Sequence, residues 1–89
     1  MEPVLVNVTS EFTKSFRKLP NNIQLQAIRK DTLFRTNVFY PSLKTHKLKG
    51  DLTGFWSYSV NYSYRILFRF VNDHEVLYYD IGTHSIYAD

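Results

Sequence analysis

The chain of 89 residues has no cysteine and no long hydrophobic run. Without cysteine it can form neither disulfide bonds nor thiolate metal sites, and without a long apolar run it cannot cross a bilayer. The opening Met1-Glu2-Pro3 lacks the basic and then apolar pattern of a secretory signal. Histidines and carboxylates are few and scattered, without zinc spacing. We therefore expect a cytoplasmic protein with no metal and no other cofactor.

Aromatic residues are what the chain has in quantity: seven Phe, seven Tyr and one Trp. A chain this short buries only about 60–65% of the surface of its unfolded state, so its stability depends on dense packing of these rings. No repeat, linker or low-complexity tract divides the sequence, and we expect a single domain over residues 1–89. The net charge of +3 is compatible with a polyanionic partner without requiring one.

The first half of the sequence predicts one strand and two helices. A β-branched stretch at 3–9 favours a strand, and Ser10 is positioned to cap a helix over 11–18. Pro20 ends this helix, and a second apolar stripe predicts a helix over 22–35. The basic residues on the outer surface of the second helix, Arg29 and Lys30, are interpreted as a solvated face.

The second half changes to a period of two, which is typical of strands. Strands are predicted at 55–61, 65–71 and 76–81, with Gly82 ending the last one and no further helix in the tail. The order β-α-α-β-β-β predicts an α+β fold: a mostly antiparallel four-stranded sheet with an N-terminal helical hairpin on one face. The first strand returns through the helices and lies parallel to a neighbour. The other sheet face is expected to be open.

Two histidines and an arginine are the main candidates for catalysis. Arg65 opens a middle strand, His46 precedes its hairpin partner, and His84 follows the last strand, so antiparallel pairing can bring the three together. Cleavage of RNA by its own 2′-hydroxyl needs a base, cations for the phosphorane and an acid for the departing 5′-oxygen. Imidazole and guanidinium groups suit these tasks without a metal. From spacing alone, each histidine is more often a surface or hydrogen-bonded structural residue.

Other residues near this cluster have two interpretations each. Lys47 and Lys49 flank one residue of an extended segment, so both ammonium groups project to one side, either to bind phosphate or to solubilise the strand. Tyr87 either stacks on a base or donates a proton, or it is a packing residue. Four further aromatic residues either form a platform for bases or fill the core: Trp56, Tyr58, Tyr62 and Tyr64.

Several motifs together resemble the RelE/ParE toxin superfamily, in particular its RelE-type and YafQ-type messenger-RNA endonucleases. The motifs are His46-Lys47-Leu48-Lys49-Gly50, Gly54-Phe55-Trp56, Tyr64-Arg65-Ile66-Leu67-Phe68, and Asp80-Ile81-Gly82-Thr83-His84 with Ile86-Tyr87. The resemblance implies the toxin of a two-gene toxin–antitoxin module. Such a toxin enters the ribosomal A site, cuts messenger RNA without a metal, and is silenced by a partner that wraps around it.

The resemblance also implies roles for individual residues. The matching positions are His46, Lys47, Lys49, Arg65, His84 and Tyr87. His46 is expected to act as general base and His84 as general acid, although these two labels can be exchanged. Arg65 with the two lysines is expected to hold the scissile phosphate, and Tyr87 to orient a base.

The sequence departs from the YafQ-type pattern at two places. YafQ-type members carry a further histidine on the first hairpin strand and an aspartate near the next turn, where this chain has Ser57-Tyr58-Ser59 and Asn61-Tyr62-Ser63. These changes remove a candidate base and put more weight on His46. Two alternatives remain: a ParE-like toxin that binds DNA gyrase without cleaving RNA, and an inactive relative that only binds antitoxin. The outer face of the hairpin and the open sheet face are both candidate antitoxin surfaces.

Overall fold

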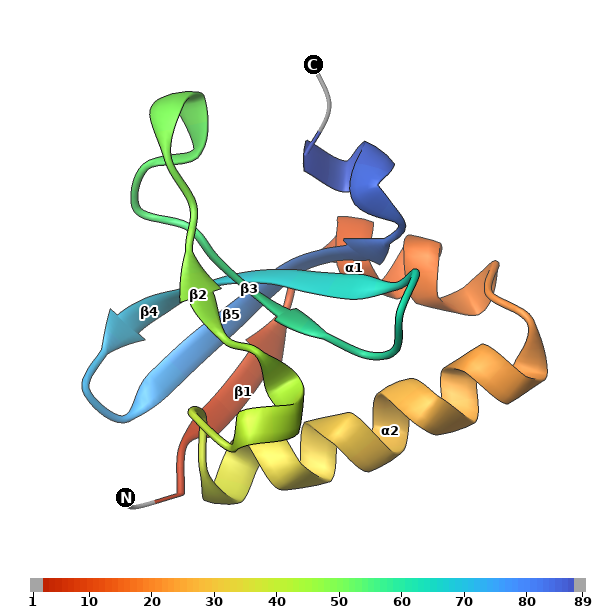
Figure 1. The fold of residues 1–89 in the computed structure, drawn as a ribbon, viewed down its shortest axis with the longest axis horizontal. Helices are drawn as coiled ribbons and strands as arrows, with labels where there is room; N and C mark the ends of the chain where they lie inside the picture. Colours follow the sequence, from red (N-terminus) through yellow and green to blue (C-terminus); the bar gives the residue numbers. More distant parts are fainter. Residues whose placement is uncertain (1–2, 88–89) are drawn as a thin grey trace.

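A computed structural model describes residues 3–87, which form two helices packed on one face of a five-stranded sheet (Figure 1). The elements are β1 (Leu5–Val8), α1 (Ser10–Arg17), α2 (Asn21–Thr36), β2 (His46–Lys47), β3 (Trp56–Ser59), β4 (Arg65–Asn72) and β5 (Glu75–Gly82), with short 3-10 helices at Pro41–Leu43, Gly50–Leu52 and His84–Tyr87. Neither α-helix in residues 3–87 combines the length and apolar character needed to span a lipid bilayer.

The sheet order is β1-β5-β4-β3-β2, with β1 parallel to β5 and every other pair antiparallel. The predicted α+β class and the parallel first strand are confirmed. The predicted number of strands was wrong by one, because β2 adds a fifth strand at the edge. His46 and Lys47 pair with Ser57 and Trp56, and the backbone N–H of Leu48 continues the ladder by donating to a carbonyl on the far side of the loop.

Polar side chains fix the start of α1 and the turn between α1 and α2. Thr9, not Ser10, caps α1: its hydroxyl accepts from the Phe12 N–H at 3.0 Å and donates to the Tyr79 carbonyl at 2.8 Å. The start of α1 is therefore fixed to β5. Between the helices, the Gln24 amide of α2 donates to the carbonyls of Phe16 and Leu19, each at 3.1 Å. These bonds tie the first turn of α2 to the end of α1 and to the residue before Pro20.

The core lies between α2 and the sheet and is largely aromatic. Phe34 of α2 is fully buried, stacks on Tyr58 with ring centroids 4.6 Å apart, and meets Phe68 edge-on at 4.9 Å. Rings in such offset and edge-on arrangements gain about 0.5–1.5 kcal/mol per pair beyond the burial of their surface. The aromatic supply noted in the sequence is therefore concentrated on the helix-covered face.

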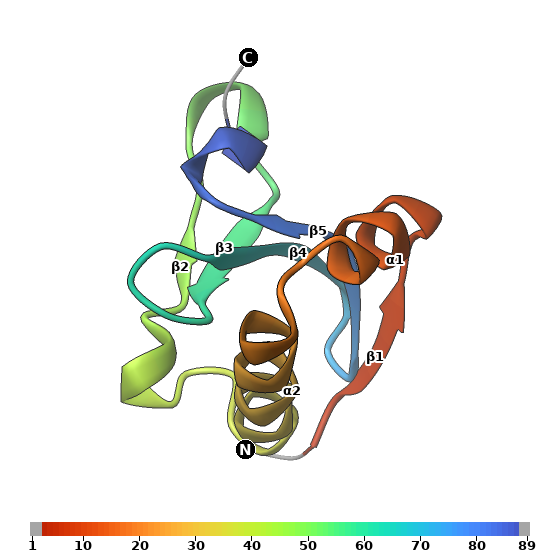
Figure 2. The ribbon, with the colours of Figure 1, turned by 90° about the vertical axis from the view of Figure 1, so that its right-hand side faces the viewer.

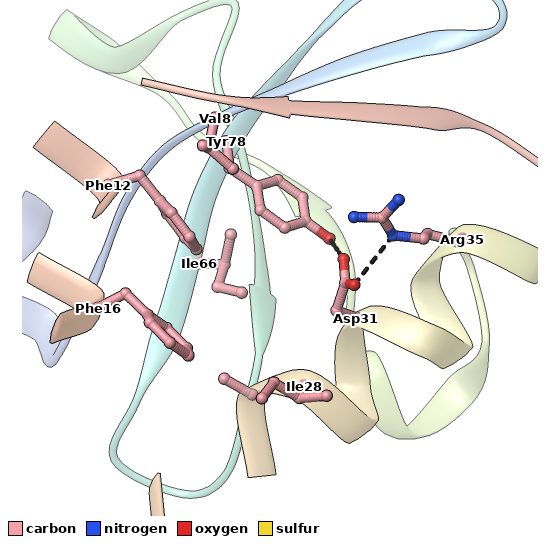
Figure 3. Close-up of a pocket in the computed structure, with 9 residues that line it drawn as sticks. Val8, Phe12, Phe16, Ile28, Asp31, Arg35, Ile66 and Tyr78 are labelled. Carbon is pink, nitrogen blue, oxygen red and sulfur yellow. Dashed lines mark hydrogen bonds and ion pairs between the residues drawn. The ribbon is translucent and has the colours of Figure 1, made fainter. Parts of the chain in front are cut away.

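A chain of hydrogen bonds crosses this core (Figure 3). The hydroxyl groups of Tyr58 and Tyr78 lie 3.0 Å apart, and Tyr78 donates to Asp31 at 2.7 Å. Since Tyr78 has one proton, Tyr58 must be the donor in the bond between them. Asp31 also forms an ion pair with Arg35 at 2.9 Å, one turn along α2. Burial raises the pKa of both tyrosines well above the ordinary value, so both remain neutral.

An apolar hollow of about 180 Å³ opens between the two helices and the sheet (Figure 3). Phe12 and Phe16 of α1, Ile28 of α2 and Val8 of β1 line it, with the Asp31 carboxylate at one end. Ile28 is 53% exposed and Val8 47% exposed. The helical side of the molecule therefore presents an accessible, mainly apolar depression.

The opposite sheet face is partly covered, contrary to the expectation of an open face. The tail, expected to contain no helix, forms the 3-10 helix His84–Tyr87, which lies with the loop around Gly50–Leu52 on the side of the sheet away from α2 (Figures 1 and 2). The chain turns tightly after β5: a Cβ added at Gly82 would lie 2.6 Å from Ile86 Cγ2. The absence of a side chain at Gly82 thus lets the tail fold back over the sheet.

Candidate functional site

The sheet register places two predicted site residues, His46 and Arg65, on the face away from α2. His46 pairs with Ser57, Ser59 pairs with Arg65, and Arg65 pairs in turn with Gly82. Paired residues share a face, and so do residues two apart on one strand. From ordinary strand spacings, the Cα atoms of His46 and Arg65 are roughly 12 Å apart. The two side chains can therefore approach one phosphodiester from different sides.

The C-terminal 3-10 helix brings the remaining two catalytic candidates to the same face. The Arg65 Nε–H donates to His84 Nε2 at 3.3 Å, and its Nη1 donates to the Ser59 hydroxyl. The Tyr87 hydroxyl is hydrogen-bonded to the Ser57 hydroxyl. The predicted meeting of Arg65 with His84 is thus present as a direct contact. Because His84 Nε2 accepts this bond, that nitrogen carries no proton in the structure.

Tyr87 lies half-buried against the sheet instead of extending into solvent. Burial raises the pKa of Tyr87, whereas the hydrogen bond with Ser57 and the charge of Arg65 act in the opposite direction. The net direction is upward, so the phenol keeps its proton at neutral pH. Its hydroxyl is consequently a donor fixed beside the strand residue that pairs with His46.

The backbone next to His46 determines which of its nitrogens is free. His46 Nδ1 lies 2.9 Å from the carbonyl oxygen of Lys44. A carbonyl oxygen only accepts, so Nδ1 carries the proton and Nε2 keeps a free lone pair. Lys44 is in the left-handed region with φ 52° and ψ 40°, which costs a residue with a Cβ about 1 kcal/mol. A strained backbone therefore holds the exposed imidazole in the form suited to accept a proton.

An open pocket of about 520 Å³ gives access to the Arg65–His84 pair. Its other lining residues are Tyr62, Ser63 and Thr83, and none of the five is acidic. Within residues 3–87, no three His, Asp or Glu side chains gather closely enough to hold a metal ion. The pocket therefore offers a guanidinium, an imidazole and hydroxyl groups to an anionic ligand.

The structure does not bring Lys47, one of the two predicted lysines, to this face. Lys47 pairs with Trp56, and its ammonium nitrogen lies 5.5 Å from the centroid of that indole ring. Neighbouring residues of a strand point to opposite faces, so Lys47 lies on the other side of β2 from His46. Lys49 lies beyond the end of β2, directly before the 3-10 helix Gly50–Leu52.

The predicted aromatic platform is reduced to one exposed ring. Tyr58 is fully buried in the core, and Trp56 packs edge-on against Phe39 and Phe70, with centroids 5.9 and 5.3 Å away. Tyr62, in the turn between β3 and β4, is 95% exposed. Its ring is accessible for stacking on a base.

Two serines were missed as site residues. In the sequence they marked the loss of a histidine, yet Ser57 is fully buried and Ser59 is 7% exposed, and they hold Tyr87 and Arg65 respectively. A buried hydroxyl needs a partner. The sequence signal was two small polar residues at alternate positions of an otherwise aromatic strand.

The fold is that of a class of small bacterial and archaeal toxins. The YoeB/ParE toxin from Agrobacterium tumefaciens has a TM-score of 0.75 at 15% identity, covering 91% of this chain and 99% of that one. A chain of the E. coli DinJ–YafQ toxin–antitoxin complex has a TM-score of 0.73 at 17% identity, covering 98% and 99%. A chain of the RelBE2 complex from Mycobacterium tuberculosis has a TM-score of 0.70 at 21% identity, covering 92% and 99%.

The sequence comparison identifies the family. The family model of the ParE-like toxin domain matches residues 21–89, which is most of the chain. A search of curated proteins found no match. The chain belongs to the ParE-like toxin domain family, within the RelE/ParE toxin superfamily, and the resemblance seen in its motifs is confirmed.

Proposed function

We propose that the chain acts as a metal-independent, ribosome-dependent messenger-RNA endonuclease that inhibits translation as the toxin of a toxin–antitoxin module. The observation that carries this proposal is the convergence of Arg65, His84 and His46 on one sheet face, with His46 Nε2 free to accept a proton. The substrate is messenger RNA in the ribosomal A site. The site uses imidazole groups and a guanidinium, which suit transfer of a phosphodiester to its own 2′-oxygen.

In the proposed reaction His46 Nε2 takes the proton of the 2′-hydroxyl. The 2′-oxygen then forms a bond to phosphorus, and the bond from phosphorus to the 5′-oxygen breaks. His84 gives a proton to the departing 5′-oxygen, and Arg65 binds the non-bridging oxygens of the phosphorane. The products are a 2′,3′-cyclic phosphate and a 5′-hydroxyl. The free lone pair of His46 favours this assignment of base and acid over the reverse.

His84 must gain a proton before it can act as the acid. In the structure its Nε2 accepts from Arg65, whose guanidinium is also bonded to Ser59. A phosphate that takes over the N–H groups of Arg65 leaves His84 Nε2 free to take up a proton. Substrate binding thus prepares the acid. Tyr87 is proposed to orient a neighbouring base and Lys49 to contribute positive charge at the scissile phosphate, whereas Lys47, on the other side of β2 from His46, takes no part in holding it.

Primer extension on messenger RNA isolated after induction tests the proposal. The wild type should give discrete new 5′ ends, which should be lost in His46→Ala and Arg65→Ala and kept in the control Lys47→Ala. His84→Ala should lower turnover at least about tenfold while ribosome binding stays intact, as expected for an interaction made only in the transition state. Uncut messenger RNA with the wild type, or equal losses of turnover and ribosome binding in His84→Ala, would contradict these roles.

We also propose an antitoxin as partner, bound at the hollow of the helical hairpin. Among the solved relatives, RelBE2 and the archaeal RelE–RelB of Pyrococcus horikoshii are complexes of this kind. The apolar lining and the half-exposed Ile28 and Val8 suit the apolar side chain of an amphipathic antitoxin helix. Ile28→Glu should weaken antitoxin binding at least about tenfold, with Leu25→Glu as an exposed control on the same helix. Equal effects of the two substitutions would exclude the hollow.

A second function is favoured by the family match alone. The matching family is that of the ParE-like toxin domain, so inhibition of DNA gyrase without RNA cleavage is the competing hypothesis. A supercoiling assay with purified gyrase discriminates between the two. Gyrase inhibition would be established as the function by two results together. Supercoiling would be inhibited equally by the wild type and His46→Ala, and messenger RNA would stay intact in induced cells.

A further inference from the structure

A second pocket lies beside Arg65, with a volume of about 310 Å³. Cations from three separate elements line it: Lys30 of α2, Lys44 before β2, and Arg65 of β4. None of the residues that line it is acidic. We propose that this pocket is a second phosphate subsite, which binds the backbone phosphate next to the scissile one in a single-stranded RNA. The inference rests on the proposed function, because it takes Arg65 to hold the scissile phosphate.

Within residues 3–87, neither lysine of the pocket forms an ion pair with a carboxylate. Lys30 is half-buried and its ammonium group donates to the Ser42 hydroxyl at 3.4 Å. The acid that follows it in sequence, Asp31, accepts from Arg35 and Tyr78 across the hairpin and so is directed away from the pocket. An uncompensated cation held near another cation favours binding of an anion.

The backbone strain at Lys44 links this pocket to the catalytic base. The left-handed conformation with φ 52° turns the Lys44 carbonyl toward His46 Nδ1. The same residue lines the lysine pocket. One strained residue therefore sets the tautomer of the base and supplies a charge to the neighbouring phosphate, which is a reason for a lysine at a position that favours glycine.

Tyr62 joins the two pockets. It lines both the opening to the Arg65–His84 pair and the lysine pocket, as Arg65 does. The turn that carries it is fixed: Asn61 accepts from the N–H groups of Ser63 and Tyr64 at 2.9 and 2.8 Å, and donates to Gln26 of α2 at 2.9 Å. A ring presented by a fixed turn between two phosphate positions is placed to stack on a base of the bound strand.

A 2′-O-methyl RNA probe tests the subsite without any cleavage, because it lacks the nucleophile. The trinucleotide carries two phosphates and the dinucleotide one, and NMR titration of labelled protein measures both affinities. In the wild type the second phosphate should tighten binding about tenfold and perturb the amides of Ser42, Lys44 and Asn61. The salt dependence of log K should steepen by about 0.7 for the added phosphate of a single strand.

The test variant is Lys30→Gln with Lys44→Gln. The control is Lys14→Gln with Lys18→Gln, two exposed lysines in α1 and directly after it. The test pair should abolish the gain from the second phosphate, while the control pair, with the same loss of charge, should keep it within twofold. Tyr62→Leu should weaken both probes and keep the gain. Unfolding temperatures of all variants confirm that each is folded.

Three results would overturn the subsite. They are no gain from the second phosphate in the wild type, an equal loss of that gain in both lysine pairs, and weaker antitoxin binding by the test pair with unchanged trinucleotide binding. The last result would assign the pocket to carboxylates of a protein partner. Failure of the proposed nuclease looks different: messenger RNA stays uncut in induced cells while the second-phosphate gain persists.

Discussion

The two faces of the sheet are built from the same strands, but one face packs the core and the other carries the candidate site. On β3, Tyr58 packs under α2 while Ser57 and Ser59 face the other way, and on β4 Ile66 and Arg65 divide in the same manner. Strand alternation thus places a densely packed aromatic layer directly behind a polar site. A rigid layer of this kind holds the residues on its outer face in fixed positions.

The polar groups of the two faces also differ in what they are free to do. On the helical face, Tyr58, Tyr78 and Asp31 bond to one another, and both tyrosines are buried. On the other face, Arg65 bonds to His84 beside an open pocket. An incoming phosphate can therefore take the place of His84 as hydrogen-bond acceptor for Arg65. We infer that substitutions on the helical face change stability first, and substitutions on the outer face change activity first.

Phe34→Ala should show the largest effect, because it removes the ring at the centre of the helical face. We expect the free energy of unfolding to fall by about 3–5 kcal/mol, the usual range for a fully buried phenylalanine. Urea denaturation measures the change, and Phe34→Leu should cost much less. A loss below about 1 kcal/mol would mean that the aromatic layer is not the main source of stability.

Arg65→Lys tests the outer face with its charge retained. A guanidinium donates from two nitrogens in fixed directions, to both Ser59 and His84, and a lysine ammonium group cannot reproduce this geometry. We expect single-turnover cleavage of messenger RNA on programmed ribosomes to fall about 100-fold, or about 2.7 kcal/mol of transition-state stabilisation. The unfolding free energy should change by less than about 0.5 kcal/mol. A variant that cleaves normally would remove the guanidinium from the mechanism.

Tyr78→Phe tests the closed hydrogen-bond chain through the dependence of stability on pH. Burial raises the pKa of Tyr78, so the folded state keeps this proton where the unfolded state loses it. Stability is therefore full below about pH 10 and falls above it, by about 1.4 kcal/mol per pH unit for each such tyrosine. The variant should have a shallower alkaline slope by that amount in urea denaturation. An unchanged slope would show that Tyr78 does not titrate on unfolding.

Gly82→Ala should have the smallest of these effects and confine it to the outer face. The added Cβ would meet Ile86 and displace the 3-10 helix that carries His84 and Tyr87. We expect cleavage to fall about fivefold, or about 1 kcal/mol in the activation free energy. The second substitution Ile86→Ala should restore most of the rate. If the double variant is no better than Gly82→Ala, the close contact is not the cause.

The comparison also explains what could be predicted from the sequence. The observed ends of both helices and of the long strands lie within a few residues of the expected ones, and the apolar period is strong in α1 and weak in α2. The edge strand His46–Lys47 has only two residues, and its pairing depends on where the loop returns to Phe55. Its absence from the prediction left the faces of His46 and Lys47 unassigned, so the role that the resemblance implies for Lys47 could not be checked against the sheet.

The missed parts of the site depend on contacts between distant residues. The tail forms a 3-10 helix because Gly82 permits the turn and the Tyr87 hydroxyl bonds to Ser57. Neither contact leaves a periodic pattern in the sequence from which it could be predicted. Lys30 was interpreted as part of a solvated helix face, yet it meets Lys44 and Arg65 in one pocket. The proximity of Arg65 and His84, predicted from antiparallel pairing, is observed because Arg65 pairs with Gly82 and His84 follows Gly82 by two residues.

The chemical identity of the 3′ end left on cut messenger RNA tests the central claim most directly. Mass spectrometry of fragments released from programmed ribosomes should find a 2′,3′-cyclic phosphate, because the account makes the 2′-oxygen the nucleophile and His46 its base. A 2′-deoxy substitution at the cut position should abolish cleavage. A 3′-hydroxyl end, or cleavage that survives the 2′-deoxy substitution, would contradict the account.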